Sequence, residues 1–543
     1  MMGARNGRKR RWGMTPAGSG AAGALALMLV AIGTPIPLSG EYTFANHHTS
    51  TGGNIRTTIM AGLRAVLPGP VATAEAATGI SEEVKIRHLL QRATFGYTSE
   101  EAARVRQMGR NEWLWEQVRP EPIDDPELQE RLSLYPSLSM ESGELLQNYP
   151  NQSRDNPVGL GPPQRILIEL RAAQITRAVH ARAQLREVLT DFWFNHFNVF
   201  ANAGPTRYTI VPYLRDSIRP HVLGKFEDLL RATAESPAML YYLDNASSSA
   251  PGTRGRNSGI NENYARELLE LHTVGVDGGY TQEDIVEVAR AFTGWTFTPR
   301  RTGAYEFQFV PGLHDPGDKQ VMGTTIPSGG RSEGDAILTM LARHPETARF
   351  ISRKLVTRFV ADDPPEAIVD RATAIYQATD GNLAIVVAAI LGDQDFFNPE
   401  YRDNKVKTPL EMVASSLRAI GADVRVGTPL FRTVGNLGQP LLESSPPTGW
   451  PERAEEFLSP GGMVSRFELA YAVAAGNLPN IDWLPLGWDN VVALFGTDGL
   501  LLYVTGRWPD PDTSAALQRA RENGASATLL AALALASPEF QLQ

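Results

Sequence analysis

The chain has 543 residues, of which 42% are hydrophobic and 20% charged. These values are those of ordinary globular proteins, which excludes a wholly disordered chain. The net charge of -9 argues against a nucleic-acid partner, because nucleic-acid-binding domains carry a basic face. The chain has no cysteine, which excludes disulfides, thiolate metal sites and cysteine nucleophiles. A chain of this length can bury a large core and be stable without disulfides.

The first 80 residues have the composition of an export segment. A basic cluster ends at Arg10 and Arg11, and an uncharged run with a short apolar centre follows it. This pattern predicts a signal peptide over residues 1–40, and an uncleaved anchor is the alternative. The paired arginines also suit the twin-arginine route. Residues 41–80 are rich in Thr, Gly and Ala, and we expect a flexible lead-in there.

From Ser81 onward the apolar residues recur at helical spacing. The sequence predicts a mainly α protein: one large multi-helical domain over residues 81–543 with a small β-hairpin insertion. Two helices are expected in SEEVKIRHLLQRATFG and TSEEAARVRQMG, because each begins with a hydroxyl residue and two acids and ends at a glycine. A long helical block is expected from Gln164 to about His196, and two short strands joined by a turn between Phe307 and Ile326.

Three stretches predict irregular or loose structure. Residues 118–164 contain eight prolines, so we expect a connector that wraps the body. Residues 247–259 have almost no apolar content, which predicts a mobile loop. Residues 421–543 contain a Gly/Pro-rich segment and are expected to pack more loosely than the rest.

The densest set of polar residues lies in GINENYARELLELHTVGVDGGYTQEDIVEVARAFTGW, residues 259–295. At 100° per residue, one stripe of a helix that begins near Asn261 carries four of them: Asn263, Arg266, Glu267 and Glu270. Gly275 is expected to end this helix, because glycine adopts the left-handed cap conformation at little cost. Thr281 and Asp284 are expected to form the capping box of the next helix, which predicts an αα-hairpin.

Composition leaves two interpretations of this stripe open. Two carboxylates near an arginine can divide acid and base roles, because burial raises one pKa while the arginine lowers another. The spacing of Glu262 and Arg266, and that of Glu287 and Arg290, is also the spacing of ordinary surface ion pairs.

Other polar residues lie among aromatic ones in DFWFNHFNVF, residues 191–200. His196 is expected to be buried there, either as a general base or metal ligand or as a hydrogen-bonded core histidine. Asp191 and Asn195 are four residues apart, so they share one helix face and can line a polar pocket.

Two further sets have a chemical and a structural interpretation. The turn LHDPGDK offers possible metal ligands at His314, Asp315 and Asp318. A Pro-Gly turn between two strands without a metal would explain the same residues. Arg349 and Arg353 share a helix face and can either bind an anion or pair with glutamates. The chain has no HExxH, CxxC, P-loop or GxSxG pattern, so the common zinc, nucleotide and serine-hydrolase sites lack support.

Together these segments resemble the bacterial family known as domain of unknown function 1800. The resemblance covers nearly the whole chain after the N-terminal segment and is carried by these motifs: HLLQRATFG (88–96), FWFNHF (192–197), INENYARELLELHTVGVDGGYTQEDIVEVARAFTGW (260–295), HPETARFISRKLVTRFV (344–360), NKVKTPLEMV (404–413), LGQPLLESSPPTGWP (437–451) and SPEF (537–540). The loop at 247–259 departs from the pattern by its greater length.

The resemblance implies an exported bacterial protein, often encoded beside a second secreted protein, which is its expected partner. It implies no activity, cofactor or metal. It does bear on the polar helix, because the family motif keeps Asn261, Glu262 and the stripe residues. Many other residues could form solvated ion pairs equally well, so this motif favours a buried polar network or pocket.

We therefore expect an exported enzyme, periplasmic, extracellular or at the cell surface, whose site lies between the 260–274 helix, the His196 segment and the His314 turn. Five residues are expected to form the site: Glu267, Glu270, Arg266, Asn263 and His196. The glutamates would be acid/base or metal-binding carboxylates, the arginine and asparagine would position an anion, and the histidine would be a companion base or ligand. The competing hypothesis is a non-enzymatic secreted or cell-surface binding protein, in which the same residues form a structural network.

Overall fold

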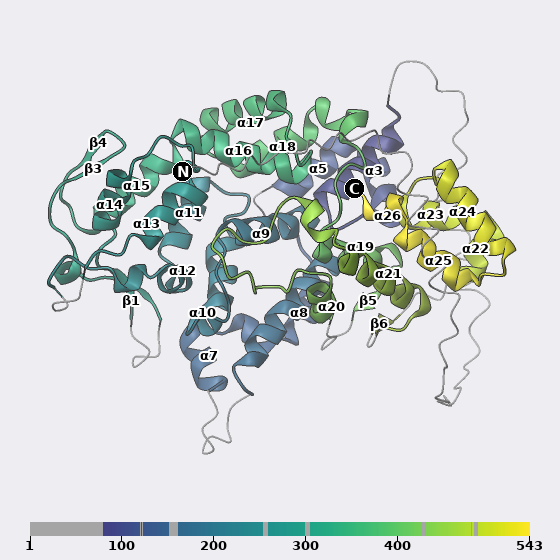
Figure 1. Cartoon of the computed structure of the whole chain (residues 1–543), viewed down its shortest axis with the longest axis horizontal. Helices are drawn as coiled ribbons and strands as arrows, with labels where there is room; N and C mark the ends of the chain where they lie inside the picture. Colours follow the sequence, from purple (N-terminus) through teal and green to yellow (C-terminus); the bar gives the residue numbers. More distant parts are fainter. Residues whose placement is uncertain are drawn as a thin grey trace, which may run out of the picture.

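The computed structural model describes residues 80–119, 121, 123–150, 161–253, 259–298, 305–424, 430–478, 481–482 and 487–543. The expected signal peptide, and the expected lead-in except its last residue, lie outside the described residues. Figure 1 shows an elongated arrangement of helices with a few short strands at its margins. The prediction of a mainly α fold is confirmed.

Among the described residues the first helices are α3 (Glu82–Ala93), α4 (Ser99–Met108) and α5 (Arg110–Val118). α4 is capped as its sequence predicts, because the Thr98 side chain accepts a hydrogen bond from the backbone N–H of Glu101. Gly109 ends α4 with a φ of 93°. α3 is buried along its second half, because it packs beneath residues 396–404, whose Asp403 carboxylate accepts hydrogen bonds from Arg87.

The proline-rich stretch 118–164 is not the irregular connector expected. It contains α6 (Pro126–Ser133), a 3-10 turn (Pro136–Ser139) and α7 (Ser142–Asn148). Pro126 occupies the first turn of α6, where a missing N–H has no partner to lose, and Asp125 caps that helix. Leu128 and Leu132 then pack against Ala172 and Ala173 of α8 (Gln164–His180). Residues 151–160 lie outside the described part.

The predicted helical block divides into α8 (Gln164–His180) and α9 (Gln184–His196). The Gln184 side-chain amide stabilises the break, because it donates hydrogen bonds to the carbonyls of Ala178 and Ala181 at 3.2 and 2.8 Å. The chain continues through these elements: α10 (Thr206–Pro212), a π-helical turn (Tyr213–Ile218), α11 (Phe226–Ala234), α12 (Pro237–Tyr242) and a 3-10 turn (Asn245–Ser247).

The predicted αα-hairpin is confirmed. α13 (Asn263–Glu267) continues into a π-helical turn (Leu268–His272). Gly275, with a φ of 83°, reverses the chain. A Thr281–Asp284 capping box then begins α14 (Gln282–Ala291).

The small β element differs from the single hairpin expected between Phe307 and Ile326. β2 (Phe307–Phe309) pairs with the upstream strand β1 (Trp295–Phe297), and β3 (Lys319–Val321) pairs with β4 (Thr324–Ile326). Both pairs are antiparallel, and a 3-10 turn (Pro311–Leu313) lies between them. A third antiparallel pair joins β5 (Asp423–Val424) to β6 (Ile481–Asp482). Strands of two or three residues are too short to produce a recognisable alternation of apolar residues.

The stretch expected as a mobile loop, 247–259, is partly buried. Ser248, Ser249 and Ala250 are at most 8% exposed, and the Ala250 N–H donates a hydrogen bond to the Leu313 carbonyl at 2.7 Å. The small side chains there permit close packing, so their low hydrophobicity does not indicate exposure. Residues 254–258 lie outside the described part.

A layer of helices covers the upper side of the molecule in Figure 1: α15 (Arg331–Ala342), α16 (Pro345–Phe359), α17 (Glu366–Ala378) and α18 (Leu383–Gly392). Two 3-10 turns (Asp395–Phe397 and Pro399–Tyr401) lead to α19 (Pro409–Ala419), which packs against α8.

The C-terminal part, which was expected to pack more loosely, is helical. Its elements are α20 (Leu430–Asn436), a 3-10 turn (Ala454–Phe457), α21 (Pro460–Ala475), α22 (Trp488–Phe495), α23 (Asp498–Thr505), α24 (Pro511–Glu522), α25 (Ala527–Ala536) and α26 (Pro538–Gln541). α25 is buried from Leu530 to Ala536, because its neighbours α21 to α24 surround it (Figure 1). The Gly/Pro-rich sequence is confined to the loop after α20.

One large hydrophobic core extends from α3 to α26 and contains fully buried tryptophans at 113, 193 and 295. Within the described residues, no helix combines the length and the apolarity needed to cross a membrane.

Candidate functional site

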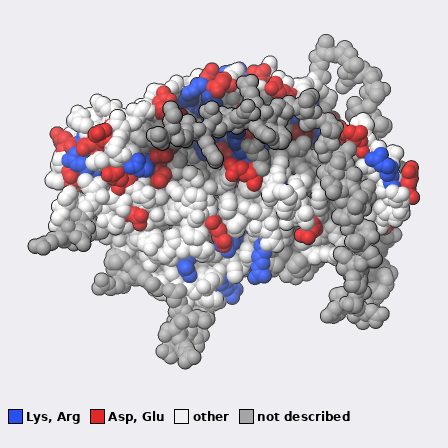
Figure 2. Space-filling model, viewed as in Figure 1, with Lys and Arg blue, Asp and Glu red and all other residues white. Residues whose placement is uncertain are grey.

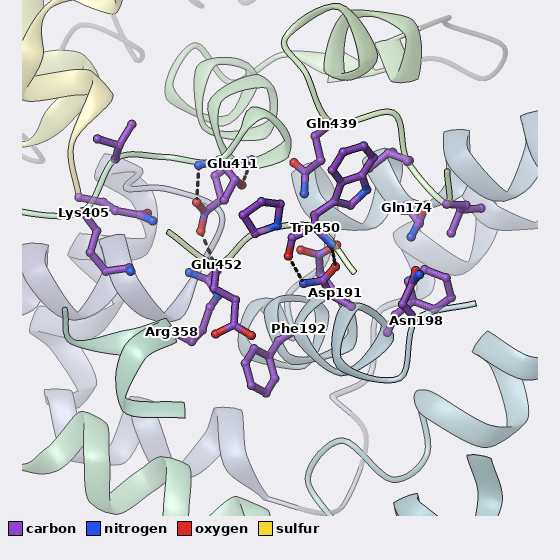
Figure 3. A pocket seen from close by; sticks show the side chains of 18 residues that line it. Gln174, Asp191, Phe192, Asn198, Arg358, Lys405, Glu411, Gln439, Trp450 and Glu452 are labelled. Carbon is purple, nitrogen blue, oxygen red and sulfur yellow. Dashed lines mark hydrogen bonds and ion pairs between the residues drawn. The ribbon is translucent and has the colours of Figure 1, made fainter. Parts of the chain in front are cut away.

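A polar cavity of about 60 Å³ lies between α9, α16, α19 and the loop after α20 (Figure 3). Six segments that are far apart in the sequence line it: Gln174, Asp191, Phe192, Phe194, Asn195, Asn198, Arg358, Lys405, Val406, Thr408, Glu411, Gln439, Leu441, Leu442, Trp450, Pro451, Glu452 and Gln543. One water molecule needs about 10–15 Å³, so the cavity has room for several waters or for one group of a ligand.

Asp191 is a partly buried carboxyl group of α9 that lines this cavity. The neighbouring Phe192 and Phe194 are buried and fix α9 in the core. No described residue forms a hydrogen bond or an ion pair with the Asp191 carboxylate. Burial raises the pKa of Asp191 to about 6; Arg358 opposes this shift and Glu411 adds to it. A group with this pKa can both donate and accept a proton near neutral pH.

Glu411 is the second buried carboxyl group of the cavity. It completes the capping box of α19, because its Oε2 accepts a hydrogen bond from the Thr408 N–H at 2.8 Å. Its Oε1 lies 2.6 Å from Nη2 of Arg358. Burial alone would raise the pKa of Glu411, but the Arg358 charge, together with the hydrogen bond from the Thr408 N–H, lowers it to about 2. Glu411 is therefore ionised throughout the pH range in which Asp191 titrates, and two carboxyl groups with separated pKa values are typical of acid–base sites.

The asparagines of α9 attach the loop after α20 to this cavity. Asn195 donates a hydrogen bond from Nδ2 to the Trp450 carbonyl at 2.8 Å and accepts one from the Trp450 N–H at 2.7 Å. Asn198 donates to the carbonyls of Ser444 and Pro446 at 3.1 and 2.8 Å. These contacts hold the backbone of residues 444–450 over the face of α9 that carries Asp191.

Gly449 permits the close approach of that loop. Its φ is 75°, and a Cβ atom there would lie 2.4 Å from the Asn195 carbonyl oxygen. We expect Gly449→Ala to lower the free energy of unfolding by about 1–2 kcal/mol for the left-handed conformation, and by roughly 1–3 kcal/mol more for the clash. Gly279→Ala is a matched control, because Gly279 has a similar φ of 79° but no neighbour within 4 Å of its Cβ position. Equal losses in urea unfolding would contradict the packing shown at Gly449.

The remaining charged residues of the cavity are paired. Lys405 forms an ion pair with Asp362, and the Glu452 carboxylate lies 2.6 Å from Nζ of Lys354. Apart from Oε1 of Glu411, which is paired with Arg358, three polar atoms of the lining are buried without a hydrogen-bond partner among the described residues: Oε1 of Gln174, Nε1 of Trp450 and Nε2 of Gln543. They are free to bond a ligand. Within the part of the chain that is described, no group of three or more His, Cys, Asp or Glu side chains could hold a metal ion.

The predicted stripe lies outside this cavity, on α13 and the π-helical turn. Nη2 of Arg266 donates hydrogen bonds to Glu262 and Gln282 at 3.3 and 3.1 Å, so the arginine is engaged within the hairpin. The Asn263 N–H donates to the Asn261 side chain at 2.9 Å, and this contact too is local. The hairpin therefore accounts for the polar contacts of both residues.

The two predicted carboxylates are partly buried, and neither forms a hydrogen bond or an ion pair with another described residue. Burial and the neighbouring Glu270 raise the pKa of Glu267, against the effect of Arg266. Glu267 also lies near Tyr242, since burial and the Glu267 carboxylate raise the pKa of that hydroxyl to about 12. Tyr242 donates a hydrogen bond to the Ser445 carbonyl at 2.7 Å, so Glu267 is close to the same loop that covers the cavity.

His196 is a buried core residue, 4% exposed. Its Nε2 lies 3.2 Å from the His272 carbonyl oxygen, and its ring packs edge-on against Trp193 and Phe197. Burial, followed by the Lys354 charge, keeps the pKa of His196 well below its usual value. The contact with His272 joins α9 to the hairpin as predicted, but His196 and the four stripe residues line none of the cavities described here.

The His314 turn belongs to a separate buried ion network. Nε2 of His314 lies 3.1 Å from Glu333, which also pairs with the fully buried Lys319. Asp315 accepts two hydrogen bonds from Arg290 at 3.2 and 2.9 Å. These contacts hold the β3–β4 pair on α14, and His314 lines none of the described cavities.

Arg349 and Arg353 pair with acidic residues, which confirms the second of the two interpretations. Arg349 binds Asp370 and Glu366 at 2.6 and 2.7 Å, and Arg353 binds Glu366 at 2.7 Å. Figure 2 shows basic and acidic side chains interleaved along the upper edge of the molecule, where α16 and α17 lie in Figure 1, with a wide, sparsely charged face below.

The helical spacing of Asp191 and Asn195 predicts a polar pocket, and both residues line the cavity. The sequence patterns did not identify Arg358, Glu411 or Trp450 as lining residues. The available indication was the set of family motifs, because three of those downstream of the hairpin each contribute to the lining: HPETARFISRKLVTRFV, NKVKTPLEMV and LGQPLLESSPPTGWP. Glu411 also belongs to TPLE, residues 408–411, which is a capping-box pattern. A helix cap alone is therefore enough to explain a glutamate at this position.

Comparisons with known proteins bear on the family alone. None of the curated proteins and none of the solved structures matches the sequence. One family matches residues 88–542, which is most of the chain and includes every residue of the cavity lining except Gln543. The chain therefore belongs to the family described as "Protein of unknown function (DUF1800)".

Proposed function

We propose that this protein is an enzyme that uses Asp191 as a general acid and base inside the polar cavity. One observation carries the proposal: an unpaired, partly buried carboxyl group lines the cavity beside a second carboxylate that an arginine keeps ionised. Catalytic carboxyl groups work best when their pKa lies near the working pH, and a pKa of about 6 meets that condition.

The other groups of the cavity have supporting roles in this proposal. Glu411 and Arg358 supply a fixed pair of charges that does not change with pH near neutrality. Gln174 and Trp450 offer an acceptor and a donor that no described residue uses, and such convergent polar groups orient ligands in pockets. Asn195 positions Trp450 through both of its backbone hydrogen bonds.

A second candidate site is the predicted stripe of Asn263, Arg266, Glu267 and Glu270 with His196. One observation favours it: the pKa of Glu267 is raised by burial and by Glu270 while its carboxylate has no partner. The buried cavity is the stronger candidate, because it encloses its carboxyl group and offers other groups to a ligand.

We further propose that the protein is exported. The support is the N-terminal sequence pattern of a basic cluster with Arg10 and Arg11, an apolar centre and a stretch rich in Thr, Gly and Ala. The paired arginines favour the twin-arginine route, and a second secreted protein is the expected partner. Cell fractionation of the bacterial host tests the location: recovery of the protein in the cytoplasm would contradict it.

The experiment that tests the catalytic proposal is a turnover screen of the purified protein. Its substrates are cell-wall glycans, other extracellular polymers and small phosphorylated molecules. We expect a substrate whose turnover depends on one ionisation near pH 6, because Asp191 must change its protonation state there. Asp191→Asn cannot exchange this proton and should lose that turnover.

The alternative function, a secreted or cell-surface binding protein, makes the opposite prediction. In that case a ligand would bind without being converted, and Asp191→Asn would bind it with unchanged affinity. This result would overturn the catalytic proposal and leave the cavity as a structural feature.

A further inference from the structure

A second cavity, of about 50 Å³, adjoins the first, because Gln174 and Asp191 line both. It lies among α8, α9 and the π-helical turn Tyr213–Ile218. Its charged and polar walls include Arg177, Glu187 and Arg219. Asp191 therefore lies between two adjoining cavities.

Arg177, on α8, has a guanidinium group without a partner. It is partly buried, and no described residue forms a hydrogen bond or an ion pair with it. Burial, followed by the nearby Arg219 charge, lowers the pKa of Arg177 to about 10, so the group is still charged at neutral pH. A buried charge without a partner is costly, and proteins pair such charges or bind an ion with them.

The surrounding charges do not neutralise Arg177. Glu187 is the carboxylate that faces these arginines, and Arg219 already donates two hydrogen bonds to it at 2.7 and 2.5 Å. Arg186 also lowers the pKa of Glu187 but forms no ion pair with it. Of the two arginines of the lining that face Glu187, Arg219 is paired with it, and Arg177 is left without a partner.

Asp191, which also lines this cavity, forms no ion pair with Arg177. Arg215, the remaining charged residue of the lining, has partners of its own. Its guanidinium is paired with Glu141 and Asp216 at 2.5 and 2.7 Å, and it also donates hydrogen bonds to the carbonyls of Leu138 and Met140.

We propose that this second cavity binds a doubly charged oxyanion, the phosphate monoester group of the substrate, with Arg177 as its principal ligand. Guanidinium groups bind phosphate through two parallel hydrogen bonds, and a phosphate monoester carries about −1.5 to −2 charges at neutral pH, so it can neutralise the unpartnered Arg177. This proposal rests on the proposed function. The phosphate group holds the substrate in the second cavity, while Asp191, which lines both cavities, exchanges a proton with the part of the substrate that lies in the first cavity.

The binding of inorganic phosphate and of glycerol phosphate tests this proposal directly, by titration calorimetry in a buffer free of other oxyanions. We expect one phosphate per chain and a loss of affinity of tenfold or more in Arg177→Gln. Arg182→Gln is the matched control, because Arg182 is an exposed arginine shortly after α8, and it should bind phosphate as the natural chain does. Glycerol phosphate should compete for the same site.

Thermal unfolding separates binding from a structural role of Arg177. Arg177→Met removes an unpaired charge, so it should unfold at a higher temperature than the natural chain without phosphate, and phosphate should no longer raise that temperature. A lower unfolding temperature without phosphate, or phosphate binding that is unchanged in Arg177→Gln, would overturn the proposal. Phosphate binding without competition by glycerol phosphate would overturn the assignment of the anion to a substrate.

Asp191→Asn distinguishes a failure of this proposal from a failure of the proposed function. The variant keeps Arg177 and should bind phosphate at least as tightly, because a neighbouring carboxylate is lost. If Asp191→Asn keeps full turnover while phosphate binding still depends on Arg177, the catalytic role of Asp191 is wrong and the anion site stands.

Discussion

Asp191→Asn is expected to make the protein more stable at neutral pH and less active, both by large amounts. The folded-state pKa of Asp191 is about 6, against about 3.9 for an aspartate in an unfolded chain. One pKa unit corresponds to about 1.4 kcal/mol, so ionised Asp191 costs the folded state roughly 2–3 kcal/mol that asparagine does not. The loss of a positioned general acid–base group lowers turnover by about 10²–10⁴-fold.

The sign of the pH dependence follows from the raised pKa. Below about pH 4 the Asp191 carboxyl group is protonated in both the folded and the unfolded state, so its ionisation does not lower the free energy of unfolding of the natural chain. Between about pH 4 and pH 6 the unfolded chain loses its proton first, and the stability of the natural chain falls as the pH rises. Urea unfolding from pH 4 to pH 7 should show this fall in the natural chain but not in Asp191→Asn.

The control for this measurement is Asp277→Asn, because Asp277 is exposed in the turn of the hairpin. Its unfolding free energy should differ little from that of the natural chain at every pH. Parallel curves for the natural chain and Asp191→Asn would show that the Asp191 carboxylate is solvated, which contradicts the cavity description.

Arg358→Met is expected to destabilise the protein strongly, because it leaves the Glu411 carboxylate buried without its cation. Removing one partner of a buried ion pair costs about 3–5 kcal/mol, whereas replacing both partners is often nearly neutral. The double variant Arg358→Met with Glu411→Gln should therefore recover much of the loss, since glutamine can still accept the Thr408 hydrogen bond that caps α19.

Urea unfolding of the four proteins in this cycle gives the coupling between the two residues. Arg349→Met is the matched control, because Arg349 lies on the same helix and pairs with Glu366 and Asp370 at the exposed surface. It should cost about 1 kcal/mol or less. Additive losses for Arg358→Met and Glu411→Gln would show that the two groups are not coupled.

The local features of the fold were predictable where they depend on residues close together in the sequence. Thr98 caps α4, and Thr281 with Asp284 opens α14, because capping needs only a hydroxyl residue and its neighbours three residues on. Gly275 turns the hairpin through its left-handed conformation. The expectation of an irregular connector failed at Pro126, because the position of a proline within a helix matters more than the number of prolines.

The candidate site was predictable only in part, because burial and pairing depend on tertiary contacts. Helical spacing placed Asp191 and Asn195 on one face, and they do line the cavity together. The same spacing could not show that Arg266 binds Gln282 across the hairpin. The π-helical turn begins at Leu268, so the 100° spacing does not extend to Glu270.

The pairing of Arg358 with Glu411 was beyond sequence reasoning for another reason. The two residues are 53 positions apart, and each has an ordinary local explanation: the arginine as a charged residue near a helix C-terminus, the glutamate as part of a cap. They become a site only when α16 and α19 face α9 around the same cavity.

The most direct test of whether function resides in the Asp191 cavity is the turnover of one substrate by two matched variants, Asp191→Asn and Glu267→Gln. Both changes replace a carboxylate with an amide of nearly equal size, and both residues have a raised pKa. We predict that Asp191→Asn loses about 10²–10⁴-fold in kcat, while Glu267→Gln stays close to the natural chain. Full activity in Asp191→Asn with a comparable loss in Glu267→Gln would contradict the assignment and place the site on the hairpin.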